Sequence, residues 1–234
     1  ANRPTLNNVL GSWPHLIIAG VNYIMRRQGP LSLGVNQLGG LVRATPDASR
    51  LDTQLYINPI TYSVTDDDTR RLTKPDRAPG FALSFNSCRP YSAGSVYIKS
   101  ADAAMPPAIH GNYLDDQRDI KDVLRMARFI GRMQNSPSVQ KLLAAPPETN
   151  LLALSDNEII DDFRARSGTV FHPCGTCRMG PDRRHSVVDP QLRVHGVGKL
   201  RVADAAIFPN ITSANTNAPT IAVAHKAADL ILQS

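Results

Sequence analysis

Three kinds of residue that take part in chemistry lie close together in FHPCGTCRMG, residues 171–180. Cys174 and Cys177 have the Cys-x-x-Cys spacing of a redox dithiol or of half a zinc site. His172 lies between an aromatic residue and a proline, which favours an extended backbone with little freedom. A base that abstracts a proton along a defined line benefits from such restraint. The stretch therefore suggests thiol or metal chemistry at the cysteines, or acid–base chemistry at the histidine.

The two cysteines fit those roles poorly. A thioredoxin-type pair lies at the start of a helix, but Gly180 and Pro181 follow too closely for a helix to begin. Zinc needs four ligands, and His172 and His185 could join the cysteines on paper. The usual second ligand cluster, a dozen or more residues away, is absent from the sequence. We therefore expect the cysteines to pack a tight loop, and we expect no metal site.

The composition is that of an ordinary globular protein. Hydrophobic residues make up 42% and charged residues 20% of the 234 residues, and the net charge is +6. Lysine and arginine form no run of five or more, which argues against a nucleic-acid partner. The apolar stretch 15–25 is about half as long as a bilayer-spanning helix and contains polar residues. It predicts a buried helix and not a transmembrane segment.

The cysteine count and the first residues bear on location. Three cysteines provide no disulfide framework, and no signal-peptide pattern is present, so we predict a cytoplasmic protein. The chain begins with Ala1 and not with methionine. We expect it to be processed or to be a piece of a longer protein, whose missing N-terminus could carry a targeting signal.

The first two-thirds of the chain predict an antiparallel sheet with helices. A helix is expected over 119–133, where apolar residues recur every three or four positions. Ser155 and Glu158 have the spacing of a capping box, which predicts a short helix through Phe163. Consecutive β-rich runs separated by polar loops usually pair antiparallel. Such runs lie at 54–57, 80–85 and 94–99.

The last third has a different pattern. Residues 192–195 and 200–203 predict two strands around a tight glycine turn. Residues 217–232 predict a helix with Asn217 as its N-cap and Pro219 in the first turn, where a missing N–H costs nothing. A strand, a loop and a helix in this order are half of an α/β unit.

Three passages near the end of the chain resemble one family closely when they are taken together. FHPCGTCRMG, SVVDPQLRVHGVGKLRVADAAIFP and NTNAPTIAVAHKAADLI follow one another between residues 171 and 231. They are similar to the C-terminal signature of the glucose-methanol-choline (GMC) oxidoreductases. Residues 90–102 and 112–116 resemble the substrate-domain pattern of that family, in a choline- or alcohol-dehydrogenase-like form.

The resemblance implies an α+β / α/β fold in two parts. Residues 1–165 would form a substrate-binding domain with an antiparallel sheet and helices. Residues 166–234 would be the C-terminal strand–loop–helix portion that completes a Rossmann-like FAD-binding domain.

The resemblance implies a flavoenzyme that oxidises a primary alcohol to an aldehyde with FAD. His172 takes the place of the base that accepts the alcohol proton as hydride passes to flavin N5. Asn215 takes the place of a second residue, His or Asn, that hydrogen-bonds the alcohol oxygen and orients it. Because Asn cannot take a proton at neutral pH, His172 is the expected base. The remaining histidines are expected to be structural or exposed: His15, His110, His185, His195 and His225.

The resemblance also implies which residues meet the cofactor. Asp204 and Ala205 are similar to the strand end that touches the ribityl and phosphate region of FAD. Asn217, Pro219 and Thr220 are similar to the turn that meets the pyrimidine edge of the flavin. A helix that starts there would direct amides at the place where negative charge gathers on reduction.

One part of the family pattern is missing. The family binds ADP through a G-x-G-x-x-G turn, and the 234 residues contain none. We expect the missing N-terminal FAD-binding part of the same protein, or a partner chain, to supply it, and the isolated chain to bind FAD weakly or not at all. Two alternatives stay open: a hydroxynitrile lyase-type member of the family, and a non-catalytic binding fragment. The alcohol, the electron acceptor and the choice between oxidase and dehydrogenase do not follow from the sequence.

Overall fold

The computed structural model of the chain describes residues 1–34, 36–62, 75–213 and 215–233. It divides into two compact units, one formed by Ala1–Asn86 with Val123–Asp161 and the other by Ser87–Asp122 with Asp162–Ser234. Compact units need not coincide with domains named for what they bind. The functional division near residue 165 therefore stays a prediction.

A three-stranded sheet forms the centre of the first unit. Its strands β1 (Leu38–Val42), β2 (Thr53–Asn58) and β3 (Ala82–Ser87) lie in that order, and β1 pairs antiparallel with β2. In that pair, Leu38 lies opposite Ile57 and Val42 lies opposite Thr53. The strands predicted at 54–57 and 80–85 are confirmed, as is a fold of helices with antiparallel sheet.

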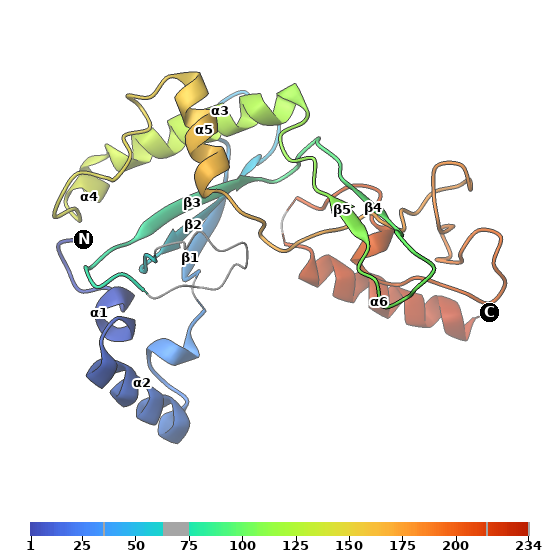
Figure 1. The fold of residues 1–234 in the computed structure, drawn as a ribbon, viewed down its shortest axis with the longest axis horizontal. Helices are drawn as coiled ribbons and strands as arrows, with labels where there is room; N and C mark the ends of the chain where they lie inside the picture. The colour runs from blue at the N-terminus through green and yellow to red at the C-terminus, as the bar shows by residue number, and fades with distance from the viewer. Residues whose placement is uncertain (35, 63–74, 214, 234) are drawn as a thin grey trace. The chain divides into compact units, whose positions relative to one another are not determined.

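Helix α3 (Gln117–Gln134) covers one face of this sheet (Figure 1). Ile130 of α3 is 2% exposed and forms a core with Leu55 of β2 and with Leu151. The apolar periodicity over 119–133 therefore predicted both the helix and its buried face. After α4 (Pro137–Gln140), the capping box begins α5 (Asp156–Arg166) as predicted. There, the Ser155 N–H donates to the Glu158 carboxylate at 2.7 Å, and the Glu158 N–H donates to the Ser155 hydroxyl at 3.3 Å.

The apolar stretch 15–25 is helical, but the prediction that it is buried is wrong. Helix α2 (Trp13–Arg26) buries Ala19 alone, whereas Trp13, Ile24 and Met25 are 70–76% exposed. Periodicity predicts that a segment is helical, but it does not say what covers the apolar side. Among the described residues, no helix is both long and apolar enough to span a bilayer. The helices beside α2 are α1 (Leu6–Leu10) and the 3₁₀ helix η1 (Pro30–Ser32).

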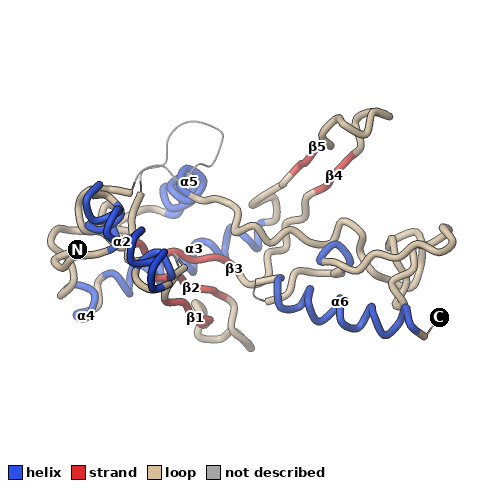
Figure 2. Tube along the Cα trace, turned by 90° about the horizontal axis from the view of Figure 1, so that it is seen from below, coloured by secondary structure: helices blue, strands red, loops and turns tan. Residues whose placement is uncertain are grey.

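The second unit has a small antiparallel ribbon and one long helix (Figure 2). Strands β4 (Ser95–Tyr97) and β5 (Ala108–His110) pair with Val96 opposite Ile109, which confirms the strand predicted within 94–99. The long helix is α6 (Asn217–Leu232), and the 3₁₀ helix η2 (Ala205–Ile207) precedes it. The core of this unit consists of buried residues from the C-terminal loops, η2 and α6: Val188, Leu192, Ile207, Phe208 and Ala227.

The strands predicted at 192–195 and 200–203 are present only as isolated bridges. Arg193 and Arg201 form one antiparallel bridge, and no strand is assigned at either segment. Leu192 and Lys199 adopt φ values of 67° and 61°, in the left-handed region. A left-handed residue interrupts extended backbone, so the pairing does not grow into a ladder.

Candidate active site

His172 has a side-chain partner at each ring nitrogen. The amide nitrogen Nδ2 of Asn215 lies 2.5 Å from Nε2, and the hydroxyl of Thr216 lies 3.2 Å from Nδ1. The partners are 43 and 44 positions further along the chain. The structure thus brings together the two residues that the motifs paired, while their catalytic roles stay predictions.

Backbone hydrogen bonds hold the loop of His172 against η2. The N–H groups of Gly175, Cys177 and Met179 donate to the carbonyls of residues 205, 206 and 207, at 3.3, 2.9 and 2.8 Å. Gly175 has a φ of +84°, and a Cβ there would lie 3.2 Å from the Phe208 carbonyl oxygen. Glycine is therefore suited to this position for its conformation and for the close approach. This pairing fixes the backbone that follows His172.

Thr216 and Asn215 lie at the start of α6. The N-cap of this helix is Thr216 and not Asn217, so the prediction of Asn217 as the N-cap is wrong by one residue. Thr216 is 7% exposed. Its carbonyl accepts two hydrogen bonds from Thr220, one from the Thr220 N–H at 3.0 Å and one from the Thr220 hydroxyl at 2.7 Å. The first turn of the helix therefore fixes the position of Thr216.

A second anchor lies just before Asn215. The Arg89 guanidinium donates to the Ser213 hydroxyl at 2.6 Å. The loop that follows Arg89 is held in turn by Asp119, which is 4% exposed and accepts from the N–H groups of Tyr91 and Ser92 at 2.8 and 2.7 Å. Sequence reasoning missed Arg89, Ser213 and Asp119, because no motif or periodicity links residues so far apart.

Of the two loop cysteines, Cys174 behaves as a packing residue. Cys174 and Cys177 are free thiols and half-buried, and Cys174 packs against the core of the second unit. Burial raises the pKa of the Cys174 thiol, against a smaller opposing effect of Arg178. A reactive dithiol requires the opposite direction. Among the residues that the structure describes, no group of three or more His, Cys, Asp or Glu side chains could hold a metal ion.

The residues predicted to meet FAD lie on two segments next to the His172 loop. Exposed Asp204 begins η2 by accepting from the Ala206 N–H at 2.7 Å, and the Ala205 carbonyl accepts from Gly175. Asn217 is exposed, whereas Pro219 and Thr220 are half-buried in the first turn of α6. The side chain of the N-cap residue Thr216 makes no capping hydrogen bond to this helix start.

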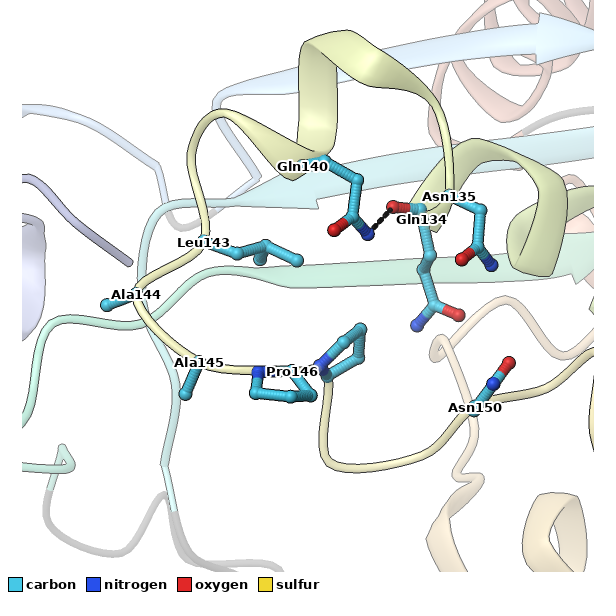
Figure 3. Close-up of a pocket in the computed structure, with 9 residues that line it drawn as sticks. Gln134, Asn135, Gln140, Leu143, Ala144, Ala145, Pro146 and Asn150 are labelled. Carbon is cyan, nitrogen blue, oxygen red and sulfur yellow. Dashed lines mark hydrogen bonds between the residues drawn. The ribbon is translucent and has the colours of Figure 1, made fainter.

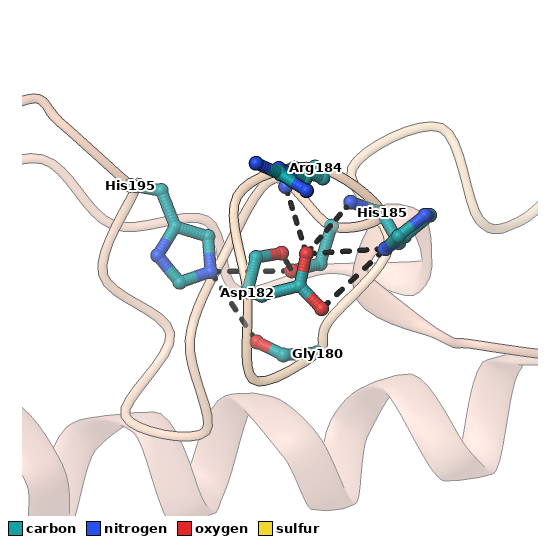
Figure 4. Close-up of polar contacts among 6 residues, drawn as sticks. Gly180, Asp182, Arg184, His185 and His195 are labelled. Carbon is teal, nitrogen blue, oxygen red and sulfur yellow. Dashed lines mark hydrogen bonds and ion pairs between the residues drawn. The ribbon is translucent and has the colours of Figure 1, made fainter.

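A second histidine of this unit, His195, holds a loop together (Figure 4). Its Nε2 lies 3.3 Å from the Gly180 carbonyl oxygen and 3.2 Å from the Ser186 hydroxyl. In the same loop, the Asp182 carboxylate accepts from the N–H of Arg184 at 2.9 Å and lies 3.1 Å from His185 Nδ1. The hydrogen bond from the Arg184 N–H lowers the pKa of Asp182, and His185 adds to the effect. We expected both histidines to be structural or exposed: His195 is half-buried in these loop contacts, and His185 is exposed.

A pocket of about 430 Å³ lies in the first unit, after the end of α3 (Figure 3). Amide side chains such as Gln134 and Gln140, together with alanines and prolines, line it. None of its lining residues is a histidine, a cysteine or a charged residue. It offers no acid, base or nucleophile, so the His172 cluster remains the candidate site.

Comparisons with known proteins agree with the motifs. The sequence model described as GMC oxidoreductase matches residues 90–224. An alcohol dehydrogenase (acceptor) of Pseudomonas putida is 37% identical over 222 residues, which are 94% of this chain and 39% of that protein. An oxygen-dependent choline dehydrogenase of Klebsiella pneumoniae is 33% identical over 83% of this chain and 34% of that protein. The chain therefore spans between about a third and two-fifths of the length of these relatives.

Solved structures show the same fold. A formate oxidase superposes with a TM-score of 0.82 over 97% of this chain and 43% of its own, at 26% identity. A pyridoxine 4-oxidase from Mesorbium loti gives a TM-score of 0.64 over 84% of this chain and 38% of its own, at 28% identity. The resemblance in the motifs and the predicted fold class are both confirmed: the chain belongs to the GMC oxidoreductase family.

Proposed function

We propose that this chain is the C-terminal, substrate-handling portion of an FAD-dependent enzyme that oxidises a primary alcohol to an aldehyde. The observation that carries the proposal is the direct contact between His172 Nε2 and Asn215 Nδ2. The names of the relatives support it, because they include an alcohol dehydrogenase and a choline dehydrogenase. We infer His172 as the base and Asn215 as the group that orients the substrate.

The types of the contacting atoms support this division of roles. An amide nitrogen can only donate, so Nε2 of His172 presents a lone pair to Asn215. An alcohol oxygen placed between them would donate its proton to Nε2 and accept a hydrogen bond from Nδ2. Two such hydrogen bonds need the nitrogens to be about 4.5 Å apart, against 2.5 Å in the structure. Substrate entry must therefore separate the two side chains, of which Asn215 is exposed.

Residues of this chain fit part of an FAD site. When bound, FAD would supply the acceptor for the hydride that leaves the alcohol carbon. Asp204, Ala205, Asn217, Pro219 and Thr220 would hold it. The start of α6 suits an electron-accepting ring because the positive end of a helix stabilises nearby negative charge, and the Thr216 side chain does not cap it. Since the 234 residues contain no G-x-G-x-x-G turn, we propose that the N-terminal part of the same protein, or a partner chain, supplies the rest of the FAD site.

The test compares His172→Ala with the unchanged full-length protein in anaerobic mixing with a series of primary alcohols. We expect flavin bleaching in the unchanged protein and a loss of roughly 10²–10⁴-fold in its rate in the variant. His225→Ala, a change of an exposed histidine on α6, is the matched control and should bleach normally. Full bleaching by His172→Ala would refute the base. Turnover of a cyanohydrin without bleaching would indicate a lyase, and the absence of both reactions would indicate a binding fragment.

A further inference from the structure

Thr216 is the N-cap residue of α6, but its hydroxyl does not cap the helix. A threonine at an N-cap normally has an extended backbone and accepts a hydrogen bond from the second or third amide of its helix. Thr216 has φ −81° and ψ −10°, and its side chain caps nothing. The third helical residue is Pro219, which has no N–H to offer. The hydroxyl lies 3.2 Å from His172 Nδ1 instead.

The two contacts of the imidazole favour one position for its proton. A neutral imidazole carries one proton, on Nδ1 or on Nε2. Asn215 Nδ2 faces Nε2 and can only donate, which favours Nε2 as the acceptor and Nδ1 as the site of the proton. A hydroxyl can accept as well as donate, so Thr216 Oγ1 is a suitable acceptor for that N–H.

We propose that Thr216 is a positioning residue, which selects the Nδ1–H tautomer of His172 and thereby leaves Nε2 free to take the alcohol proton. The proposal rests on the proposed function of His172. Family motifs pointed to His172 and Asn215, whereas Thr216 emerges from the geometry alone.

The surroundings of Thr216 make it a fixed acceptor. Its β-branched side chain has few rotamers, and it is 7% exposed. Both hydrogen bonds from Thr220 hold its backbone to the first turn of α6. A rigid acceptor keeps the ring in one orientation as well as one tautomer, because Nδ1 and Nε2 are held at opposite edges of the ring.

The experiment measures the tautomer directly, in the full-length protein labelled with ¹⁵N-histidine, by long-range ¹H–¹⁵N NMR. The His172 signals are assigned by their loss in His172→Ala. We compare Thr216→Ser, which keeps the hydroxyl, with Thr216→Val, which keeps the shape without it. We expect Nδ1–H in the unchanged protein and in Thr216→Ser. In Thr216→Val, we expect a mixture of tautomers and a fall in kcat of about tenfold, with little change in KM.

Thr5→Ala is the matched control for a purely structural effect. Thr5 is also a helix N-cap, and its hydroxyl accepts from the Gly80 N–H at 3.1 Å. Both residues belong to the compact unit that does not contain His172. Thr5→Ala should lower thermal stability and leave the His172 tautomer unchanged. A shifted tautomer in Thr5→Ala would overturn the proposal, because a general loss of stability would then be enough to change the tautomer of His172.

Two results would overturn the proposal directly. One is an Nε2–H tautomer in the unchanged protein, and the other is an unaltered tautomer in Thr216→Val. If only the proposed function is wrong, the result differs: Thr216→Val still changes the tautomer of His172, but no alcohol reduces the flavin. In that case the control of His172 by Thr216 holds and only its use in alcohol oxidation is refuted.

Discussion

His172 and His195 are both half-buried in the same unit, and both have two polar neighbours, yet their partners place the ring protons differently. At His172, Nε2 faces an amide donor, so this nitrogen keeps its lone pair. At His195, Nε2 faces the Gly180 carbonyl, which can only accept, so this contact favours a proton on Nε2. The type of each partner atom, more than burial or the number of contacts, indicates which histidine can serve as a base through Nε2.

The two histidines also differ in what they connect. His195 contacts residues 9 and 15 positions before it, so it closes a local loop. His172 contacts residues 43 and 44 positions after it, at the start of a different element. Loss of His195 should therefore mainly affect the stability of one loop, whereas changes around His172 should mainly affect chemistry.

The largest expected effect comes from giving His172 the kind of partner that His195 has. Asn215→Asp places an acceptor opposite Nε2, which draws the ring proton to that nitrogen and removes the base. We expect kcat to fall by up to about 10⁴-fold, which is the loss seen when the imidazole proton of a catalytic triad is misplaced. Stopped-flow measurement of flavin reduction in the full-length protein gives the rate.

The matched control for the added charge is Asn210→Asp, at an exposed position of the same region. It should leave flavin reduction within about threefold of the unchanged rate, as surface changes away from a site usually do. If Asn215→Asp reduced flavin as fast as this control, the donor at Nε2 would not matter, and the comparison between the two histidines would fail.

A smaller effect is expected at His195. His195→Ala removes the contacts to Ser186 and to the Gly180 carbonyl, and one net hydrogen bond contributes about 1 kcal/mol to stability. We expect Tm of the full-length protein to fall by about 2 °C or less per kcal/mol lost, because the shift shrinks with chain length, and flavin reduction to stay within about threefold. Differential scanning fluorimetry and the same stopped-flow assay measure the two quantities. A loss of activity as large as that of His172→Ala would give His195 a catalytic role after all.

Local patterns predicted the helices well, but they did not predict what covers them. Both α2 and α3 were recognised from apolar residues, yet Ile130 of α3 is 2% exposed and Ile24 of α2 is 70% exposed. Burial depends on the sheet that α3 meets, with Leu55 contributed from far along the chain. A single sequence carries no direct signal of such a contact between elements that lie far apart in the chain.

The candidate site shows the same division between local and long-range information. His172 and Asn215 were found because each lies in a recognisable motif. Thr216 was missed because asparagine is a preferred N-cap, and Asn217 therefore took that assignment. A signal was available: Pro219 at the third helical position removes an amide that the cap would serve, which leaves the threonine hydroxyl for another partner. The tie between Arg89 and Ser213, across 124 positions, had no signal in the sequence.

The smallest expected effect concerns the carboxylate of the His195 loop. The Arg184 N–H and His185 hold the pKa of Asp182 below its ordinary value of 3.8. A carboxyl whose pKa is lower in the folded state stabilises the fold above its unfolded pKa, and this contribution is lost as the pH falls through the lower, folded value. Above about pH 5, titration of Asp182 should therefore not change the stability of the loop. Protonation of Asp182 should loosen the loop only at more acid pH.

Hydrogen exchange of residues 180–195 between pH 2 and pH 5, corrected for the intrinsic pH dependence of exchange, measures this loosening. Asp182→Asn keeps an acceptor oxygen for the Arg184 N–H but cannot titrate, so its protection should change less with pH across this range. Flavin reduction near neutral pH should be equal in the two proteins, because the loop holds its shape there with or without the charge. A large loss of activity in Asp182→Asn at neutral pH would mean that this loop, and with it His195, is coupled to the chemistry at His172.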